Sequence, residues 1–212
     1  MARYTGAVCK LCRREEMKLN LKGERCFTEK CSYDKRPFAP GDKPKKGGRR
    51  QVSDYGQQLR EKQKVKRIYG VLEKQFRSYF RRADRMTGVT GENLLRLLEM
   101  RLDNVVFRLG FAPSRKAARQ MVLHHHISVN GRTVDIGSYR TRVGDDITVR
   151  AREKSRGSMY VIAGRAAAGL STKMDWLALD EKNFTGRVLS EPRRDHVDLT
   201  IKENLIVELY SK

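Results

Sequence analysis

Four cysteines are the side chains of this sequence whose type and spacing best suit them to chemistry. Cys9 and Cys12 form one close pair, Cys26 and Cys31 form another, and thirteen residues separate the pairs. This spacing, C-x2-C-x13-C-x4-C, is typical of one zinc ion held in a tetrahedron by four thiolates. Four cysteine ligands leave no open position for water, so the predicted Zn2+ site is structural rather than catalytic.

Disulfides, a redox pair, an iron-sulfur cluster and four unconnected thiols are the alternative interpretations of these cysteines. A chain of 212 residues can bury an ordinary hydrophobic core and does not require disulfides for stability. No apolar run is long enough for a membrane span, and MARYTGAVCK lacks the apolar core of a secretory signal. We therefore expect a cytoplasmic protein with reduced thiols, and a redox pair would need only one CxxC motif.

The charge of the chain indicates a polyanionic partner. The sequence has 46 lysine and arginine residues against 25 aspartate and glutamate residues, a net charge of +21. Such a field attracts nucleic acid before any contact is made. The run KPKKGGRR at 43–50 contains no acid and reads as a flexible linker that binds phosphates, with a merely solubilising linker as the alternative.

Two stretches with helical spacing follow the linker. Ser53 is a helix N-cap, and the apolar spacing up to about Arg85 predicts one or two helices. On these helices Phe76, Tyr79 and Phe80 could stack on bases, but their periodicity favours a place in the core. A second amphipathic stretch, capped by Thr90, predicts one helix whose apolar face runs over 94–109.

A short helix and a small sheet complete this part of the chain. Ser114 is the N-cap of SRKAARQMVLH, in which Ala117, Ala118, Met121 and Val122 take one side. Arg115, Lys116 and Arg119 take the other side and have no acidic partner three or four residues away on the helix, which predicts a row of unpaired cations that face RNA phosphates. The period then changes to two: ISVNGRTVD predicts a hairpin with an Asn-Gly turn, and VGDDITVR predicts a third strand. The fold class is therefore α+β. A metal role for the three histidines at 124–126 is disfavoured, because neighbouring side chains point in different directions.

Long segments of the chain resemble a known family. RLDNVVFRLGFAPSRKAARQMVLHHHISVNGRTVDIGSYRTRVGDDITV resembles the small RNA-binding module named after ribosomal protein S-four. MARYTGAVCKLCRREEMKLNLKGERC, SDYGQQLREKQKVKRIYGVLEKQFRSYF and ENLIVELYSK resemble the bacterial small-subunit ribosomal proteins of that family, and the four cysteines match its zinc-containing branch. Two stretches depart from it: GDKPKKGGRR replaces the usual Gly-Gln-His-Gly turn, and RGSMYVIAGRAAAGLSTK, where we expect a helix, is unusually small and apolar.

The resemblance implies a primary binder of small-subunit ribosomal RNA at a helix junction in the 5′ domain, which helps to start assembly. It also implies a role in translational accuracy, contact with ribosomal protein S-five and other small-subunit proteins, and a place near the messenger RNA entry channel. The predicted parts are a zinc-binding segment with basic linker at 1–45, a helical lobe at 46–92 joined by the C-terminal segment 190–212, and an α/β lobe at 93–189 that contains the RNA-binding module at 99–160.

The predicted RNA contacts are basic side chains of these parts and one capping serine. They are Arg13, Arg14, Arg49, Arg50, Arg60, Lys62, Lys64, Lys66, Arg67, Ser114, Arg115, Lys116, Arg119, Arg132 and Arg140.

Two other classes of protein can contain similar features. RNA-modifying enzymes such as pseudouridine synthases contain the same module, and Arg101-Leu102-Asp103 resembles part of their catalytic motif. The chain lacks room for a catalytic domain and contains no P-loop, dinucleotide fingerprint or nucleophile elbow, so we expect neither an enzyme nor a small-molecule substrate. A zinc-finger regulator would need a recognition helix for duplex DNA or a dimerisation heptad, and neither is evident.

Overall fold

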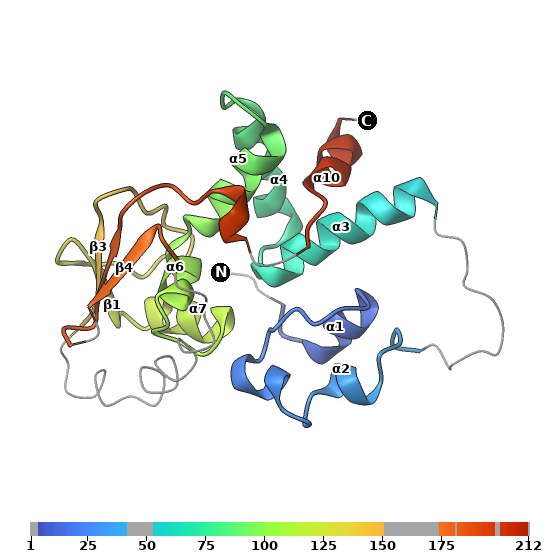
Figure 1. Cartoon of the computed structure of the whole chain (residues 1–212), viewed down its shortest axis with the longest axis horizontal. Helices are drawn as coiled ribbons and strands as arrows, with labels where there is room; N and C mark the ends of the chain where they lie inside the picture. The colour runs from blue at the N-terminus through green and yellow to red at the C-terminus, as the bar shows by residue number, and fades with distance from the viewer. Residues whose placement is uncertain (1–3, 42–52, 151–173, 181, 198–199, 212) are drawn as a thin grey trace. The chain divides into compact units, whose positions relative to one another are not determined.

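The computed structural model of the chain describes residues 4–41, 53–150, 174–180, 182–197 and 200–211 (Figure 1). The chain divides into two compact units, residues 1–94 with 199–212 and residues 95–198. Helices and a small antiparallel sheet confirm the predicted α+β class. None of the described helices is long and apolar enough to cross a membrane. The predicted basic linker at 43–50, with Arg49 and Arg50, and the helix expected at 156–173 lie outside the described residues.

The first unit begins with short elements and continues with longer helices. The short ones are α1 (Cys9–Arg14), the 3-10 helix η1 (Gly23–Phe27) and α2 (Ser32–Lys35), and the longer ones are α3 (Asp54–Ile68), α4 (Glu73–Asp84) and α10 (Glu203–Tyr210). Ser53 caps α3 as predicted, since its hydroxyl oxygen accepts the Gly56 N–H at 3.2 Å. Gly70, at φ +61°, ends α3, and the Val71 N–H donates back to the Lys66 carbonyl, which separates α3 from α4.

The C-terminal helix α10 packs on α3 and α4. Gln58 on α3 donates a 2.9 Å hydrogen bond to Glu208, and Phe76 and Phe80 of α4 stack on Tyr210, with ring centroids 6.3 and 4.5 Å apart. Both phenylalanine side chains are buried. The predicted place in the core is therefore confirmed for the two phenylalanines, whereas Tyr79 is half-buried.

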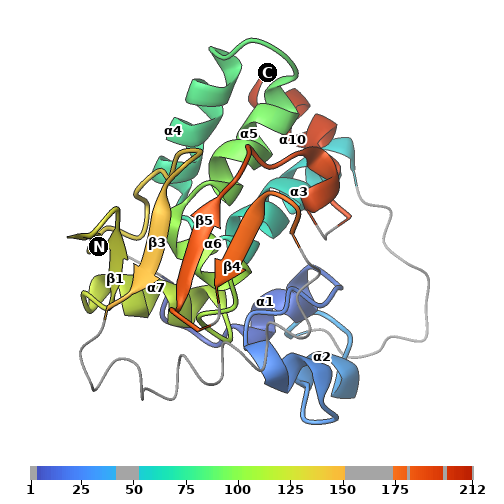
Figure 2. The same ribbon diagram turned by 60° about the vertical axis from the view of Figure 1, so that its left-hand side comes forward.

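The second unit packs helices on one sheet. Helix α5 (Thr90–Glu99) starts in the first unit, and α6 (Leu102–Arg108), α7 (Arg115–Leu123) and the 3-10 helix η2 (Arg194–His196) lie in the second. The antiparallel sheet has the order β2-β1-β3-β5-β4, with β1 (Ile127–Val129), β2 (Arg132–Thr133), β3 (Asp146–Val149), β4 (Leu177–Asp180) and β5 (Thr185–Val188). Figure 2 shows α6 and α7 behind this sheet. The predicted hairpin is confirmed, because Asn130 and Gly131 at its turn have φ +49° and +78°.

One apolar core joins these helices to the sheet. Its members are buried residues of α6, α7 and the strands, among them Val105, Met121, Ile147 and the fully buried Trp176. Strands β4 and β5 were not predicted from the sequence. Gly186 of β5 lies against Leu109, so close that a Cβ atom there would meet its side chain at 2.4 Å. A glycine is therefore required at this core-facing position of β5. The alternating apolar residues that would predict a strand are interrupted there.

The predicted single helix over 94–109 is wrong. The chain is extended at Arg101, which separates α5 from α6. Here the backbone pairs with a distant loop: Arg101 bridges Arg140, and Thr141 donates its N–H at 2.9 Å and its hydroxyl at 3.0 Å to the Met100 carbonyl oxygen. The apolar periodicity continues through the break, so a helical wheel does not reveal it.

Candidate nucleic-acid interface and cysteine cluster

The four cysteines lie in the short elements of the first unit. Cys9 and Cys12 are on α1, Cys26 is on η1 and Cys31 is the N-cap residue of α2. All four are free thiols; Cys9 is half-buried and the other three are buried. The Lys22 N–H donates to the Cys26 sulfur at 3.4 Å. The predicted pairs are therefore in one small segment without disulfides.

The cysteine cluster matches zinc in donor type, though not in its geometry. Burial raises the pKa of Cys12 and of Cys26, and the neighbouring thiols raise both pKa values further. The sulfurs therefore lie within electrostatic reach of one another. Within the described ranges, however, no group of three or more histidine, cysteine or acidic side chains is arranged to hold a metal ion. Zinc binding thus stays a prediction, supported by the donor set and not by the arrangement of the sulfurs.

The predicted RNA-binding cations of α3 form ion pairs with acidic side chains of the same unit. Arg60 and Arg67 form ion pairs with Glu15, whose side chain is 1% exposed. Lys64 pairs with Glu61 on the same helix. Burial raises the pKa of Glu15, while the two arginines oppose this shift. Arg60 and Arg67 therefore also hold α3 against the cysteine segment, a role that their sequence positions did not reveal.

Lys62 and Lys66 share the carboxylate of Glu73 at the start of α4. The nitrogen–oxygen distances are 2.9 and 3.0 Å. Burial alone would raise the pKa of Glu73, but hydrogen bonds from Lys62, Lys66 and Tyr210 outweigh it and lower the pKa to about 2. Two of the predicted phosphate contacts therefore already have an anionic partner.

The row of unpaired cations predicted on α7 is not present. Ser114 caps the helix as predicted, because its hydroxyl oxygen accepts the Ala117 N–H at 3.3 Å. Lys116 is exposed, but Arg119 is 11% exposed and lies 3.6 Å from Asp103 on α6. The helical wheel of α7 considered only acidic residues on the same helix. Asp103 belongs instead to α6, which packs against α7.

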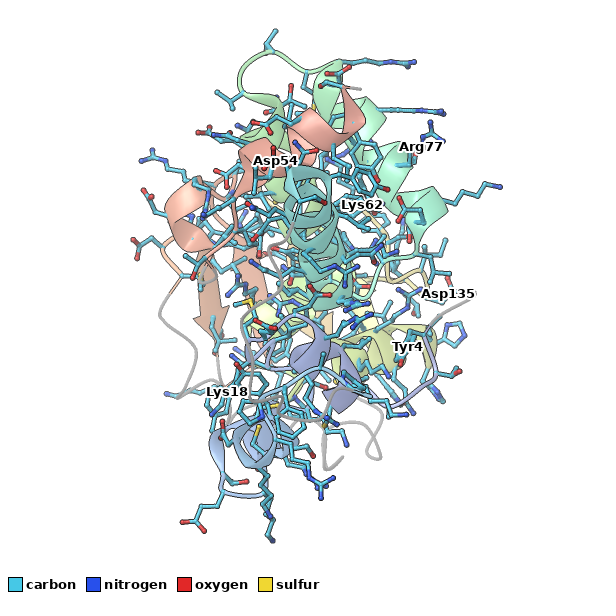
Figure 3. All side chains as sticks on the ribbon, turned by 90° about the vertical axis from the view of Figure 1, so that its right-hand side faces the viewer. Tyr4, Lys18, Asp54, Lys62, Arg77 and Asp135 are labelled. Atoms are coloured by element: carbon cyan, nitrogen blue, oxygen red, sulfur yellow. The ribbon has the colours of Figure 1, made fainter. Side chains whose placement is uncertain are left out.

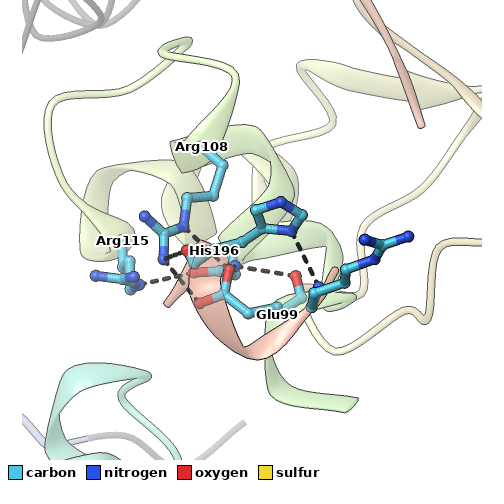
Figure 4. A network of polar contacts seen from close by, with 6 residues as sticks. Glu99, Arg108, Arg115 and His196 are labelled. Carbon is cyan, nitrogen blue, oxygen red and sulfur yellow. Dashed lines mark hydrogen bonds and ion pairs between the residues drawn. The ribbon is translucent and has the colours of Figure 1, made fainter. Parts of the chain in front are cut away.

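Arg115 of α7 belongs to a buried polar network (Figure 4). Its Nε donates to Asn104 Oδ1 at 2.7 Å, and its guanidinium lies over the Phe107 ring at 4.6 Å. The Asn104 amide donates in turn to Glu99 at 2.7 Å, and Arg108 holds the Glu99 carboxylate with two hydrogen bonds of 3.0 and 2.9 Å. The position of the Arg115 side chain is therefore set by Glu99 on the other side of the network.

Asp103, the residue that resembles an enzyme's catalytic aspartate, is a structural side chain. Arg101 grips its carboxylate with hydrogen bonds of 2.9 and 2.6 Å, and both side chains are buried. A buried carboxylate held by an arginine fork is not accessible to a flipped base.

The remaining predicted contacts differ in exposure. Arg14 and Arg132 are exposed, and Arg140 is half-buried. Arg13 donates to the Phe38 carbonyl oxygen at 2.9 Å and lies over the Phe38 ring. His124 and His126 stack with parallel rings 6.2 Å apart.

None of the predicted RNA contacts lies on α4, although this helix has an exposed basic surface in the described part of the first unit. Helix α4 exposes a set of cations that form no ion pair in the described part of the chain: Lys74, Arg77, Arg81, Arg82 and Arg85. Arg77, Arg81 and Arg85 recur every four residues and so form one stripe about 12 Å long. Figure 3 shows Arg77 at the surface of α4. The run FRSYFRRADR could have predicted this stripe from the sequence. Its apolar residues lie on one face of a helix and its arginines on the opposite face.

Comparisons with known proteins agree on the class to which this chain belongs. The model of the ribosomal protein S4/S9 N-terminal domain matches residues 3–99, and the model of the S4 domain matches residues 100–147. The chain is 56% identical to small ribosomal subunit protein uS4 of Heliobacterium modesticaldum over 212 residues, which is the full length of both chains. It is 57% identical to the same protein of Thermoanaerobacter pseudethanolicus, again over the full length of both. The chain is thus a ribosomal protein of the S4-domain class. It belongs to the uS4 family of small ribosomal subunit proteins.

Proposed function

We propose that this chain is a structural constituent of the small subunit of the cytoplasmic ribosome and that it binds small-subunit ribosomal RNA. Membership of the uS4 family supports this role, as does the net charge of +21. The chain has no enzymatic role in this proposal. The burial of Asp103 argues against the RNA-modifying enzyme, which was one of the two alternatives.

The observation that carries the proposal is the arginine stripe of α4. Phe76, Phe80 and Ala83 bury the opposite face of the helix, so the stripe is held in one orientation. Exposed guanidinium groups without acidic partners can grip phosphates with two hydrogen bonds each. The paired cations of α3 are available only if phosphates displace Glu15, Glu61 or Glu73. We therefore assign the first phosphate contacts of this unit to α4.

Binding of the full chain to a 5′-domain fragment of small-subunit ribosomal RNA tests this assignment. Arg77→Glu with Arg81→Glu should weaken binding at least tenfold, because each change removes a contact and adds repulsion. The matched control reverses two exposed lysines elsewhere, Lys182→Glu with Lys202→Glu, with the same change in net charge. Equal losses in both variants would mean that only net charge acts, and no loss in the first would overturn the role of α4.

The salt dependence of the same binding reports the number of phosphates contacted. If the chain neutralises about 6–10 phosphates, affinity should fall by about 10³ or more between 50 and 200 mM salt. Competition with duplex DNA of equal length separates a ribosomal protein from a regulator that binds DNA. Preference for the duplex DNA would contradict the proposal.

Finer roles of the family are part of the proposal. These are early binding at the 5′-domain junction that helps to start assembly, contact with ribosomal protein S-five, a place near the messenger RNA entry channel and an influence on accuracy. They rest on the family resemblance. Footprinting on the ribosomal RNA during stepwise assembly tests the first of them, since an early binder protects its site before other proteins are added.

We also propose that Cys9, Cys12, Cys26 and Cys31 together bind one structural zinc ion. Four thiols within 23 residues supply a complete tetrahedral donor set. The metal would fold a segment that has few large apolar side chains of its own.

Metal analysis of the pure protein tests this zinc site, and about one equivalent of zinc is expected. Removal of the metal by a chelator should make residues 4–41 sensitive to protease while residues 95–150 stay protected. Serine in place of Cys12 should abolish metal binding. If all four thiols react with a thiol reagent in protein purified in the presence of zinc, the proposal is overturned.

A further inference from the structure

The loop between β2 and β3 exposes large apolar side chains on the second unit. Ile136, Tyr139 and Val143 are 51%, 36% and 52% exposed. They lie within eight residues of one another along the loop. Exposed apolar side chains gathered on one short segment are typical of a binding surface rather than of random exposure.

The backbone of this loop is held in place by the rest of its unit. The Leu102 N–H donates to the Tyr139 carbonyl oxygen at 2.9 Å, and the Asp103 N–H donates to the Gly137 carbonyl oxygen at 3.0 Å. A Cβ atom on Gly137 would lie 3.2 Å from the Asp103 carboxylate. The loop is therefore tied to the start of α6 and cannot easily turn its apolar side chains inward.

The exposed charged side chains of residues 132–145 are mostly positive. Arg132 and Arg142 are exposed and form no side-chain ion pair in the described part of the chain. Asp145 is buried, and its carboxylate accepts hydrogen bonds from the Asn130 side-chain amide and from the Arg142 backbone N–H. Of the acids in 132–145, only Asp135 is exposed. An apolar protein partner does not require such a cationic border, whereas a nucleotide offers a flat apolar base beside a phosphate.

We propose that this loop binds an unpaired RNA base, with the Tyr139 ring stacked on the base and Arg132 and Arg142 contacting the adjacent phosphates. Stacking on aromatic side chains beside cations is the usual means by which proteins hold single-stranded RNA. The inference rests on the proposed RNA-binding function and adds to it the class of nucleotide that the second unit recognises. It concerns residues distinct from the stripe of α4.

Binding of full-length variants to the 5′-domain fragment of small-subunit ribosomal RNA, measured at several salt concentrations, tests this inference. Tyr139→Leu keeps an apolar side chain but removes the ring, and it should weaken binding roughly tenfold at every salt concentration. The salt slope should stay unchanged, because stacking releases no counterions, whereas Arg142→Ala should lower the slope. Tyr139→Trp should bind as the parent does. Leu189→Ala, which truncates an exposed apolar side chain outside the loop, is the control and should have no effect.

The outcomes separate this inference from the proposed function. A parent protein that does not bind the RNA fragment overturns both. A parent that binds, with Tyr139→Leu equal to it, overturns only the stacking role. Loss of binding to ribosomal proteins without loss of RNA affinity would assign the loop to a protein partner and would also overturn it. The melting temperature of each variant should stay within a few degrees of the parent's, so that a loss of affinity reports the missing ring.

Discussion

The hydroxyl of Tyr210 donates a 2.9 Å hydrogen bond to the carboxylate of Glu73, which joins the end of α10 to the start of α4. Lys62 and Lys66 of α3 donate to the same carboxylate. One side chain therefore links α3, α4 and α10 of the first unit. Burial raises the pKa of Tyr210, and the hydrogen bond to Glu73 raises it further.

This arrangement predicts a contribution of Glu73 to stability that depends on pH. The folded-state pKa is about 2, below the ordinary value of 4.5, so the ionised form stabilises the fold. The contribution is complete above about pH 4.5 and is lost as the pH falls toward 2. Since Glu73 is 45% exposed, solvent screening limits the contribution to about 1 kcal/mol.

Urea unfolding of Glu73→Gln against the parent measures this contribution. The variant should be less stable by up to about 1 kcal/mol at pH 7, with the difference shrinking as the pH approaches 2. Glu92→Gln is the control, because Glu92 is exposed and forms no ion pair in the described ranges. A difference that grows on acidification would contradict the assigned sign.

Truncation of Met121 should destabilise the second unit through its core. The side chain is 2% exposed and packs between α7 and the sheet. Met121→Ala should lower the free energy of unfolding by about 2–5 kcal/mol, because it leaves a cavity. Thermal unfolding followed by circular dichroism measures the loss, and a change below about 1 kcal/mol would show that the site collapses to fill the space.

Two of the three cations of α7, Lys116 and Arg119, should differ in their effect on stability. Arg119→Met removes a partner of the buried Asp103, which keeps only Arg101, and should cost about 1–3 kcal/mol. Lys116→Met changes an exposed side chain and should stay within about ±0.5 kcal/mol. Charge reversal at Arg119 therefore does not measure RNA contact alone, contrary to what the helical wheel indicated. Equal stability of both variants would mean that the pair with Asp103 contributes nothing.

The ion pair between Glu99 and Arg108 should behave as a coupled unit. Arg108→Met removes the two hydrogen bonds that the guanidinium donates to the buried Glu99 carboxylate, to which Asn104 also donates, and it should cost about 3–5 kcal/mol. Adding Glu99→Gln removes the buried charge that has lost its arginine and should recover at least about 1 kcal/mol of that loss. Denaturant unfolding of both single variants and the double variant gives the coupling energy. Strictly additive losses would contradict a shared network.

The features that sequence reasoning predicted correctly depend on neighbours in the chain. Ser53 and Ser114 cap helices whose first amides lie three residues away, and Asn130 with Gly131 tolerates the backbone of a tight hairpin. The same reasoning failed at Arg101, where an apolar helical period continues across a break. It also missed the stripe on α4, because the candidate contacts were chosen from other basic runs.

The sequence by itself determined the charge of the chain, the spacing of its cysteines, the helix caps at Ser53 and Ser114 and the hairpin turn, because these follow from residue types or from contacts within a few residues. The predicted cap at Thr90 is wrong, since Thr90 is the first residue of α5. Only the tertiary structure decided which cations are available to a phosphate. Arg67 meets Glu15 and Arg119 meets Asp103 through packed elements that are distant in the chain. The stripe of α4, by contrast, has no acid opposite it among the described residues. Pairing of charges depends on distance in space, and folding sets that distance independently of separation along the sequence.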